Sequence, residues 1–365
     1  MGAMYGLSRT RGLLVALFLV LLAALWAIRG IHDDKEALKY IGCAQDLLRG
    51  DAHDLICRYK AYASYVLFLL PGVAMGTPAL AVVAQAVLAV LAAFALTRVV
   101  ERVSGSVRAG TIALAIVLLC YPLQEWVLAL YTESFFVSIA VLFLERATRP
   151  GRSLWTVFLL GAVLLLARPN GILFVLPVLI WEIREPFQVP RWLRPVACAA
   201  MLLLVALLPG VPRDHLGVIV EGHVICGFPE RPGALEDFHG TTILAAQRSL
   251  FQEPAYAAGL FLRRAASLFT LTRPYYSSGH NRLLMPFYVL FVLAAVGWWR
   301  WKADTLAGLL LAVILLNVVL IGLTYDEWNG RFLVPLWPLI IAFAATGLDA
   351  LVGRFAGEGP WAFKT

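Results

Sequence analysis

Repeated apolar segments of membrane length constrain the fold of this 365-residue chain more than any other feature. Hydrophobic residues make up 61% of the sequence and charged residues only 15%, and the mean hydropathy is +0.80. Water-soluble domains do not bury so many apolar stretches, and a bilayer core about 30 Å thick needs roughly 20 helical residues per crossing. The sequence therefore predicts an all-α polytopic membrane protein, in which residues 1–365 form a single transmembrane domain of about ten helices.

The first predicted span covers residues 13–28 and follows two basic residues, Arg9 and Arg11. This arrangement is also typical of a signal peptide, but no small-x-small cleavage site follows the apolar run, so we expect a retained helix. The other predicted spans cover residues 80–97, 109–121, 127–144, 154–167, 172–181, 196–208, 285–299, 306–323 and 332–351.

Basic residues in the short connections predict the orientation of these spans, because Lys and Arg favour the cytoplasmic side. With the N-terminus in the cytoplasm, every short connection on that side is basic. These connections hold Arg98, Arg102, Arg108, Arg146, Arg149, Arg152, Arg184, Arg191, Arg194, Arg300 and Lys302. We therefore expect a multi-pass plasma membrane protein, and the Ala, Leu and Arg-rich composition favours a bacterial inner membrane.

This orientation requires that residues 61–74, a short segment interrupted by Pro71 and Gly72, do not cross the membrane. Residues 31–77 then form a first outer loop and residues 212–282 a second one, each with helices that lie along the outer membrane surface. All the distinctive polar motifs fall on this extracytoplasmic face.

An acidic cluster, His32-Asp33-Asp34-Lys35-Glu36, follows the first span directly in a chain where charge is sparse. Asp33 with Glu36 three residues later approaches a helix capping box, and an apolar stripe continues as far as Gly50. The sequence therefore predicts a helix over residues 34–49. In one interpretation both aspartates only start this helix, but a cap explains one aspartate and not two.

The second aspartate has a chemical interpretation. Asp34 lies just above the predicted membrane surface and close in sequence to Tyr40 and further tyrosines, so a partly dry cleft would suit it as a general base. Asp34 is the first choice for this role and Asp33 the second.

The same loop resembles the first outer loop of the GT-C glycosyltransferases. The acidic pair comes directly after the first span and is followed by Tyr40, Ala44 and Gly50-Asp51. The members of this family are multi-span enzymes that use polyprenyl-phosphate sugars as donors, and aminoarabinose, protein O-mannosyl and GPI mannosyltransferases are among them. Asp33-Asp34 stands where the family more commonly has Asp-Glu.

Three further segments extend the resemblance along the chain. Tyr131-Thr132-Glu133-Ser134 is similar to the start of a span in lumenal mannosyltransferases, and Arg168-Pro169-Asn170-Gly171 to their Arg-x-Asn-Gly turn. Asp326-Glu327, followed by Gly330-Arg331-Phe332, resembles the late acidic and arginine segment of the family.

The resemblance implies a membrane glycosyltransferase that moves a sugar, such as the hexose mannose, from a polyprenyl-phosphate donor to a lipid, glycan or protein acceptor on the outer face, with inversion. Asp34 or Asp33 would accept the acceptor proton, while Arg331 and Arg168 would neutralise the departing phosphate. The expected substrate-binding residues are Glu133, Tyr131, Tyr40, Asn170, Asp326 and Glu327. No cofactor is expected.

Each supporting residue also has a plainer interpretation. Glu133 suits the N-terminal end of a helix because the helix dipole favours a negative charge there. Arg168 suits a turn from which it reaches the lipid headgroups. Arg331 suits an ion pair with Asp326 or Glu327.

Other sequence features exclude some functions and leave others open. The net charge of +7 is spread over short connections, which favours membrane lipids and not nucleic acid as partners. Cys43 and Cys57 would form a disulfide outside the cytoplasm, although Cys226 offers other pairings. His215, His223, Cys226 and Glu221 match no closed zinc pattern, so we expect no metal. A transporter or flippase of lipid-linked sugars is the alternative function, but no repeated halves support it.

Overall fold

The computed structural model describes residues 2–184, 213–324 and 329–355, and these residues are helical apart from turns, loops and two isolated β-bridges. They divide into two compact units. The first unit contains the described residues among 2–184, 287–311 and 337–355, and the second contains those among 213–286, 312–324 and 329–336. The all-α prediction is confirmed for the described residues.

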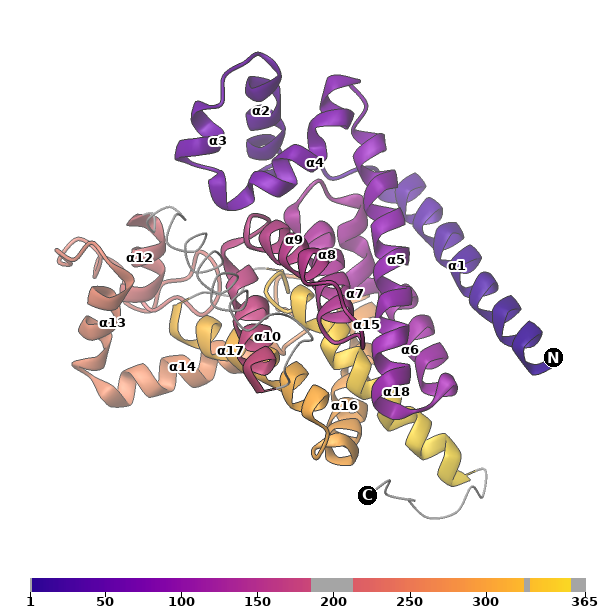
Figure 1. Cartoon of the computed structure of the whole chain (residues 1–365). Coiled ribbons are helices and arrows are strands. Elements are labelled where there is room, and N and C mark those ends of the chain that lie inside the picture. Colours follow the sequence, from indigo (N-terminus) through magenta and orange to yellow (C-terminus); the bar gives the residue numbers. More distant parts are fainter. Residues whose placement is uncertain (1, 185–212, 325–328, 356–365) are drawn as a thin grey trace. The chain divides into compact units, whose positions relative to one another are not determined.

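The chain up to the first gap supplies most of the first unit (Figure 1). Its helices are α1 (Gly2–Arg29), α2 (Glu36–Leu48), α3 (His53–Cys57), η1 (Lys60–Tyr62), α4 (Ala63–Ala74), α5 (Pro78–Ser104), α6 (Val107–Leu119), α7 (Tyr121–Gln124), η2 (Glu125–Leu128), α8 (Thr132–Ala147), α9 (Leu154–Leu165), η3 (Pro169–Gly171) and α10 (Ile172–Arg184). The later elements are α12 (Arg213–Val220), α13 (Ile243–Phe251), α14 (Pro254–Leu268), α15 (Ser278–Leu284), η4 (Met285–Phe287), α16 (Tyr288–Trp301), α17 (Thr305–Thr324), η5 (Val334–Leu336) and α18 (Trp337–Phe355).

Five helical stretches in the described residues are long and apolar enough to cross a membrane, which confirms a polytopic protein. They are Arg9–Arg29, Pro78–Ser104, Ser278–Trp301, Thr305–Thr324 and Val334–Phe355, and a bent pair made by Val107–Leu119 with Tyr121–Leu128 adds a sixth if it is one broken span. The predicted number of about ten stays a prediction. Three of the predicted spans correspond to α8, α9 and α10, which are shorter at 16, 12 and 13 residues, and the predicted span 196–208 lies outside the described residues.

A sharp bend separates α6 from α7. The two segments meet at 58°, and Pro122 stands in the first turn of α7. A break inside an apolar segment leaves backbone carbonyls without their helical donors. The buried side chain of Gln124 compensates, since its Nε2 donates to the Val117 carbonyl oxygen at 2.6 Å.

Helices α16 and α18 pack backbone to backbone at the core of the first unit. A Cβ atom at Gly297 would collide with the Phe343 carbonyl oxygen, and one at Gly347 with the Leu293 carbonyl oxygen. Small residues that let two helices approach this closely are typical of membrane helix pairs. The same two helices also meet at the rings of Phe291 on α16 and Trp337 on α18, which stack with their centroids 5.5 Å apart.

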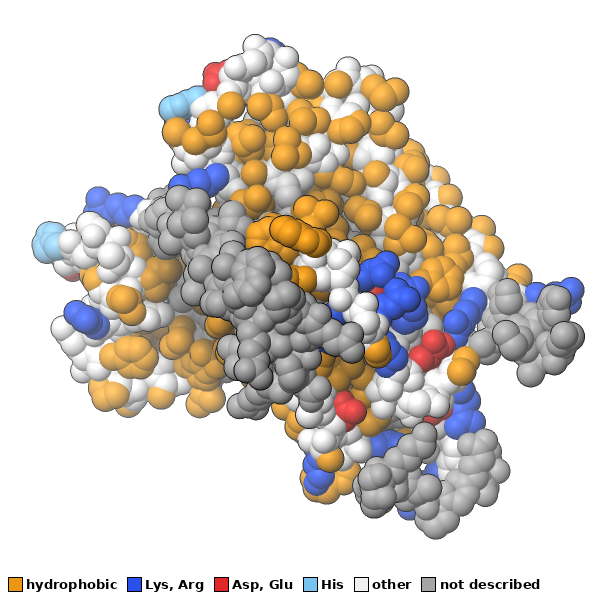
Figure 2. Space-filling model, viewed as in Figure 1, with side chains coloured by type: hydrophobic (Ala, Val, Ile, Leu, Met, Phe, Trp, Pro, Cys, Tyr) orange, Lys and Arg blue, Asp and Glu red, His pale blue; other side chains and the backbone are white. Residues whose placement is uncertain are grey.

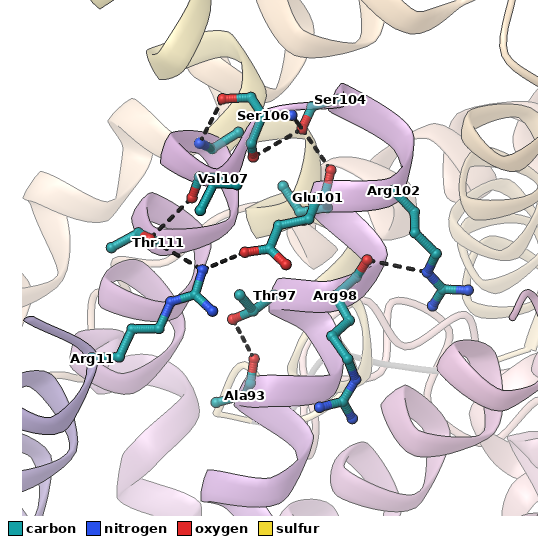
Figure 3. A network of polar contacts seen from close by, with 12 residues as sticks. Arg11, Ala93, Thr97, Arg98, Glu101, Arg102, Ser104, Ser106, Val107 and Thr111 are labelled. Carbon is teal, nitrogen blue, oxygen red and sulfur yellow. Dashed lines mark hydrogen bonds and ion pairs between the residues drawn. The ribbon is translucent and has the colours of Figure 1, made fainter. Parts of the chain in front are cut away.

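Ion pairs join the helix ends at one end of the first unit. Arg11 of α1 pairs with Glu101 of α5 and lies 3.4 Å from the Thr111 hydroxyl of α6, as Figure 3 shows. On the other side of α5, Arg98 and Arg102 reach Glu145 of α8 at 3.3 and 3.5 Å.

A further ion pair joins Arg108 of α6 to Asp349 of α18 at this end. Figure 2 shows basic side chains gathered with acidic ones on the face in view, among large apolar areas. This end contains several of the connections predicted to be cytoplasmic, whereas α2, α3, α4 and the start of α5 lie at the opposite end of α5 (Figure 1). Which end faces the cytoplasm stays a prediction.

The second unit has a small helical core of its own. It is built from α12, α13 and α14, within the predicted second loop of residues 212–282, and its buried residues are Leu216, Ile219, Val220, Ala246, Leu250, Ala257 and Leu260. The buried side chain of Arg264 donates to the carbonyl oxygens of His223 at 2.6 Å and Val218 at 2.7 Å. These bonds fix the turn after α12 against α14.

Candidate active site

A short parallel backbone pairing brings the segment after α1 to the segment just before α8. The His32 N–H donates to the Leu128 carbonyl at 2.9 Å, and the Leu130 N–H donates to the His32 carbonyl at 2.9 Å. In an extended pairing of this kind, residues two positions further along each segment again stand beside each other. Asp34 and Tyr131 occupy these positions.

Asp34 accepts a hydrogen bond from the Tyr131 hydroxyl, with 3.2 Å between the Tyr131 Oη and the Asp34 Oδ1. Asp34 itself is exposed, while Tyr131 is buried and its ring packs on Trp126 with centroids 6.0 Å apart. A buried tyrosine therefore orients one oxygen of an accessible carboxylate. The other oxygen can accept a proton from a substrate.

The predicted capping box is wrong. Helix α2 begins at Glu36, its N-cap is Lys35 with a φ of 49°, and no side chain caps it. Asp33, exposed, does not have the predicted capping role, and the Asp34 side chain is turned to Tyr131. The predicted helix itself is confirmed, since α2 ends at Leu48 close to the expected stop at Gly50.

Tyr40 lies at the centre of an aromatic cluster that joins α2 to α4. It is buried, and its ring centroid lies 6.4, 5.4 and 5.4 Å from those of Tyr59, Tyr62 and Tyr65. Burial raises the pKa of Tyr65 well above its ordinary value, and the nearby negative charge of Glu133 raises it further. The cluster packs α2 against α4, and the Tyr65 ring extends it to Phe135 of α8, with ring centroids 5.7 Å apart. A direct substrate contact by Tyr40 stays a prediction.

Glu133 and Arg168 form a buried ion pair. The Arg168 Nη1 lies 2.8 Å from the Glu133 Oε1, and the side chains are 7% and 0% exposed respectively. The guanidinium also lies over the Phe136 ring, 5.8 Å from its centroid. Arg168 therefore does not reach out to headgroups as the plainer interpretation proposed. Glu133 stands in the first turn of α8, two residues after Tyr131, so the start of α8 supplies one partner to each of the two contacts.

Local packing directs Arg168 inward. It is extended and stands just before η3, where a Cβ atom on Gly171 would collide with the Leu164 carbonyl oxygen, so the turn requires glycine. The end of α9 is also held by Ser64 at the start of α4, whose N–H donates to the Leu166 carbonyl at 3.0 Å and whose hydroxyl donates to the Val163 carbonyl at 2.8 Å.

The remaining predicted residues are placed less completely. Asn170 is half-buried, and its Oδ1 is buried with no hydrogen-bond partner among the described residues. Arg331 is buried in the second unit, after Asn329 and Gly330 with positive φ values of 51° and 72°. Asp326 and Glu327 lie outside the described residues. The roles predicted for these four residues stay predictions.

Gln85 is a site residue that the sequence reasoning missed. Its side chain is fully buried in α5, and its Nε2 donates to the carbonyl oxygens of Val127 at 2.9 Å and Ala129 at 3.0 Å. The signal was present, because a lone amide within the apolar run of residues 80–97 is costly in a membrane and marks a functional or structural contact.

Neither a metal site nor a disulfide is found in the part of the chain that the structure describes. No group of three or more His, Cys, Asp or Glu side chains there could hold a metal ion, although Glu221 and His223 meet at 3.2 Å. Cys43 is buried on α2 and Cys57 is exposed at the end of α3, and both are free thiols. The disulfide considered between them is absent, and a function without metal stays a prediction.

Comparison with known proteins concerns the fold. No protein-family model matches the chain, and no curated protein matches it. Among solved structures, the chain is similar to the crystal structure of ArnT from Cupriavidus metallidurans in the apo state, with a TM-score of 0.52 and 14% sequence identity over 94% of this chain. The chain has an ArnT-like fold. It covers 61% of the length of the ArnT chain.

The ArnT-like fold agrees with the helical, polytopic architecture expected from the apolar segments. Since the identity is only 14%, the likeness describes how the helices are arranged. The chemistry of this chain depends on its own residues, above all on Asp34, Tyr131, Glu133 and Arg168.

Proposed function

We propose that this chain is a membrane glycosyltransferase that moves a sugar from a polyprenyl-phosphate donor to an acceptor hydroxyl on the extracytoplasmic face. The proposal extends to a hexose such as mannose as the sugar and to a lipid, glycan or protein as the acceptor. Asp34 serves as the general base, with Asp33 as the second choice. The helical, ArnT-like fold and the separate resemblance of the acidic and arginine motifs to those of GT-C glycosyltransferases both support this proposal.

The contact between Asp34 and Tyr131 is the observation that carries this proposal. It joins two segments that the sequence resemblance had singled out separately, although they stand 97 positions apart. A helix-starting aspartate would have turned its side chain to the N-terminal amides of α2, and Asp34 does not. A carboxylate fixed by one hydrogen bond and otherwise accessible is suited to proton transfer.

The proposed reaction is a single displacement. The acceptor oxygen attacks the anomeric carbon as its proton passes to the Asp34 carboxylate, and the bond from that carbon to the phosphate oxygen breaks. The new glycosidic bond has the opposite anomeric configuration, and polyprenyl phosphate leaves with the bonding electron pair. No covalent sugar intermediate forms on the protein.

The leaving phosphate needs positive charge close to where its own charge develops. Arg168 supplies it in this proposal, and its Nη1 already binds the Glu133 carboxylate at 2.8 Å. A guanidinium has five N–H donors and can bind both a carboxylate and a phosphate oxygen. Arg331 is proposed as the second phosphate-binding residue.

The proposal is tested by reconstituting the purified chain in vesicles with a set of polyprenyl-phosphate sugars and acceptor lipids or glycans. We expect release of free polyprenyl phosphate and a product of inverted anomeric configuration by NMR. The doubly substituted protein Asp33→Asn, Asp34→Asn serves as the inactive control at matched folded amounts. Movement of the intact lipid-linked sugar across the vesicle membrane without its cleavage would instead establish the transporter or flippase alternative.

A further inference from the structure

The buried side chain of Gln85 uses both its donor nitrogen and its acceptor oxygen in hydrogen bonds to other segments of the chain. Besides its two donated bonds to Val127 and Ala129, its Oε1 lies 3.5 Å from the Tyr65 hydroxyl, which donates to it. Tyr65 in turn lies close enough to Glu133 to be influenced by its charge. One buried side chain therefore connects α4, α5 and the backbone that leads into α8.

The backbone that Gln85 holds is the same segment that pairs with the first outer loop. The carbonyl oxygens of Val127 and Ala129 accept from Gln85, whereas the Leu128 carbonyl and the Leu130 N–H bond to His32. The segment is thus bound on both edges, with an amide side chain on one edge in place of a neighbouring strand. A side chain with two N–H donors on one atom is needed to hold two carbonyls at once.

We propose that Gln85 is a positioning residue for sugar transfer, which fixes the 127–130 backbone so that Tyr131 meets Asp34 in the geometry needed for proton abstraction. This inference rests on the proposed function. Gln85 itself touches neither substrate nor the reacting atoms. Its effect passes through the backbone to Tyr131 and from there to the carboxylate.

The structural half of the inference is tested by hydrogen exchange. Gln85→Met keeps the length of the side chain and removes its donors, and Thr97→Val is the matched control. Thr97 is also buried in α5, but its hydroxyl donates to the Ala93 carbonyl of the same helix at 2.9 Å (Figure 3). We expect the amides of His32 and Leu130 to exchange about tenfold faster or more in Gln85→Met, and at the wild-type rate in the control. Equal exchange in the two variants would overturn the inference.

The functional half is tested by a double-mutant cycle with Tyr131→Phe. Gln85→Met is expected to lower kcat by about tenfold to hundredfold, because small displacements of a catalytic group have effects of that size, and to change the donor KM by no more than about twofold. In the Tyr131→Phe background the same substitution should change kcat by less than about twofold, since the contact that it positions is already gone.

Independent, multiplying effects of Gln85→Met and Tyr131→Phe on kcat would contradict the inference even if the hydrogen exchange changed, because Gln85 would then support the fold without acting through Tyr131. The failure of the proposed function is recognised separately. In that case the wild type transfers no sugar, while the hydrogen-exchange comparison still reports on whether Gln85 holds the segment.

Discussion

The buried ion pair between Glu133 and Arg168 makes a quantitative prediction about stability. Replacing one partner of a buried pair leaves an uncompensated charge and costs about 3–5 kcal/mol. With the Glu133 side chain 0% exposed and the Arg168 side chain 7% exposed, little water can compensate the remaining guanidinium in a Glu133→Gln variant. We therefore expect the free energy of unfolding of this variant to fall by an amount in that range.

A second variant separates the charge effect from packing. Glu133→Gln combined with Arg168→Met removes both charges, so the double variant should be more stable than Glu133→Gln alone. The single variant retains an unpaired buried charge, which the double variant does not. This comparison needs no assumption about the absolute strength of the ion pair.

The assay is equilibrium unfolding in mixed detergent micelles, followed by tryptophan fluorescence. The matched control is Glu253→Gln, which breaks an ion pair with Arg231 of similar length, 2.5 Å, but with side chains 58% and 36% exposed. Exposed pairs contribute little because water screens them. An equal loss of stability in Glu133→Gln and Glu253→Gln would refute the argument that the Glu133–Arg168 pair is desolvated.

Two further predictions concern thiol chemistry and helix packing. Burial, and then the negative charges of Asp54 and Asp46, raise the pKa of Cys43 to about 11. A maleimide should therefore modify the exposed Cys57 quickly at pH 8 and Cys43 only as the pH approaches 11, as measured by mass spectrometry of the labelled peptides. Equal labelling of the two thiols at pH 8 would contradict the burial of Cys43. Gly297→Val should lower the free energy of unfolding by about 1–3 kcal/mol, because the new side chain collides with α18. Gly308→Val, whose new Cβ has nothing within 4 Å, should have a far smaller effect in the same unfolding assay. A similar loss of stability in both variants would count against close α16–α18 packing.

The sequence predicted local features of the site better than its long-range contacts. The helix expected over residues 34–49 is present as α2, because its apolar stripe and the stop near Gly50 are local signals. The prediction that Asp33 caps this helix was wrong, since α2 begins only at Glu36, without a side-chain cap. The chain before α2 is instead held by the tertiary contact of Asp34 with Tyr131, which no local preference for a cap predicts. An isolated backbone bridge such as that between His32 and Ala129 leaves no periodic pattern in either segment.

The motifs around Glu133 and Arg168 were identified from the sequence, but their mutual pairing was not. They stand 35 positions apart in separate helical segments, and each had a plausible solitary role as a helix-end charge or as a headgroup contact. Gln85, in contrast, belongs to no motif that the sequence analysis singled out. A single amide in an apolar helix was visible in the sequence, but only the structure reveals which carbonyls it binds.

The role of Asp34 as the general base is decided by the initial rate of sugar transfer by Asp34→Asn, compared with Asp33→Asn and with Asp46→Asn as a matched control at equal amounts of folded protein. Asp46 lies on α2, and its carboxylate lies 3.5 Å from the Arg49 guanidinium three residues away. Removing a general base lowers the rate by about 10²–10⁴-fold. We expect a loss of this size in Asp34→Asn and near wild-type rates in the other two variants. Wild-type transfer by Asp34→Asn would contradict this role of Asp34.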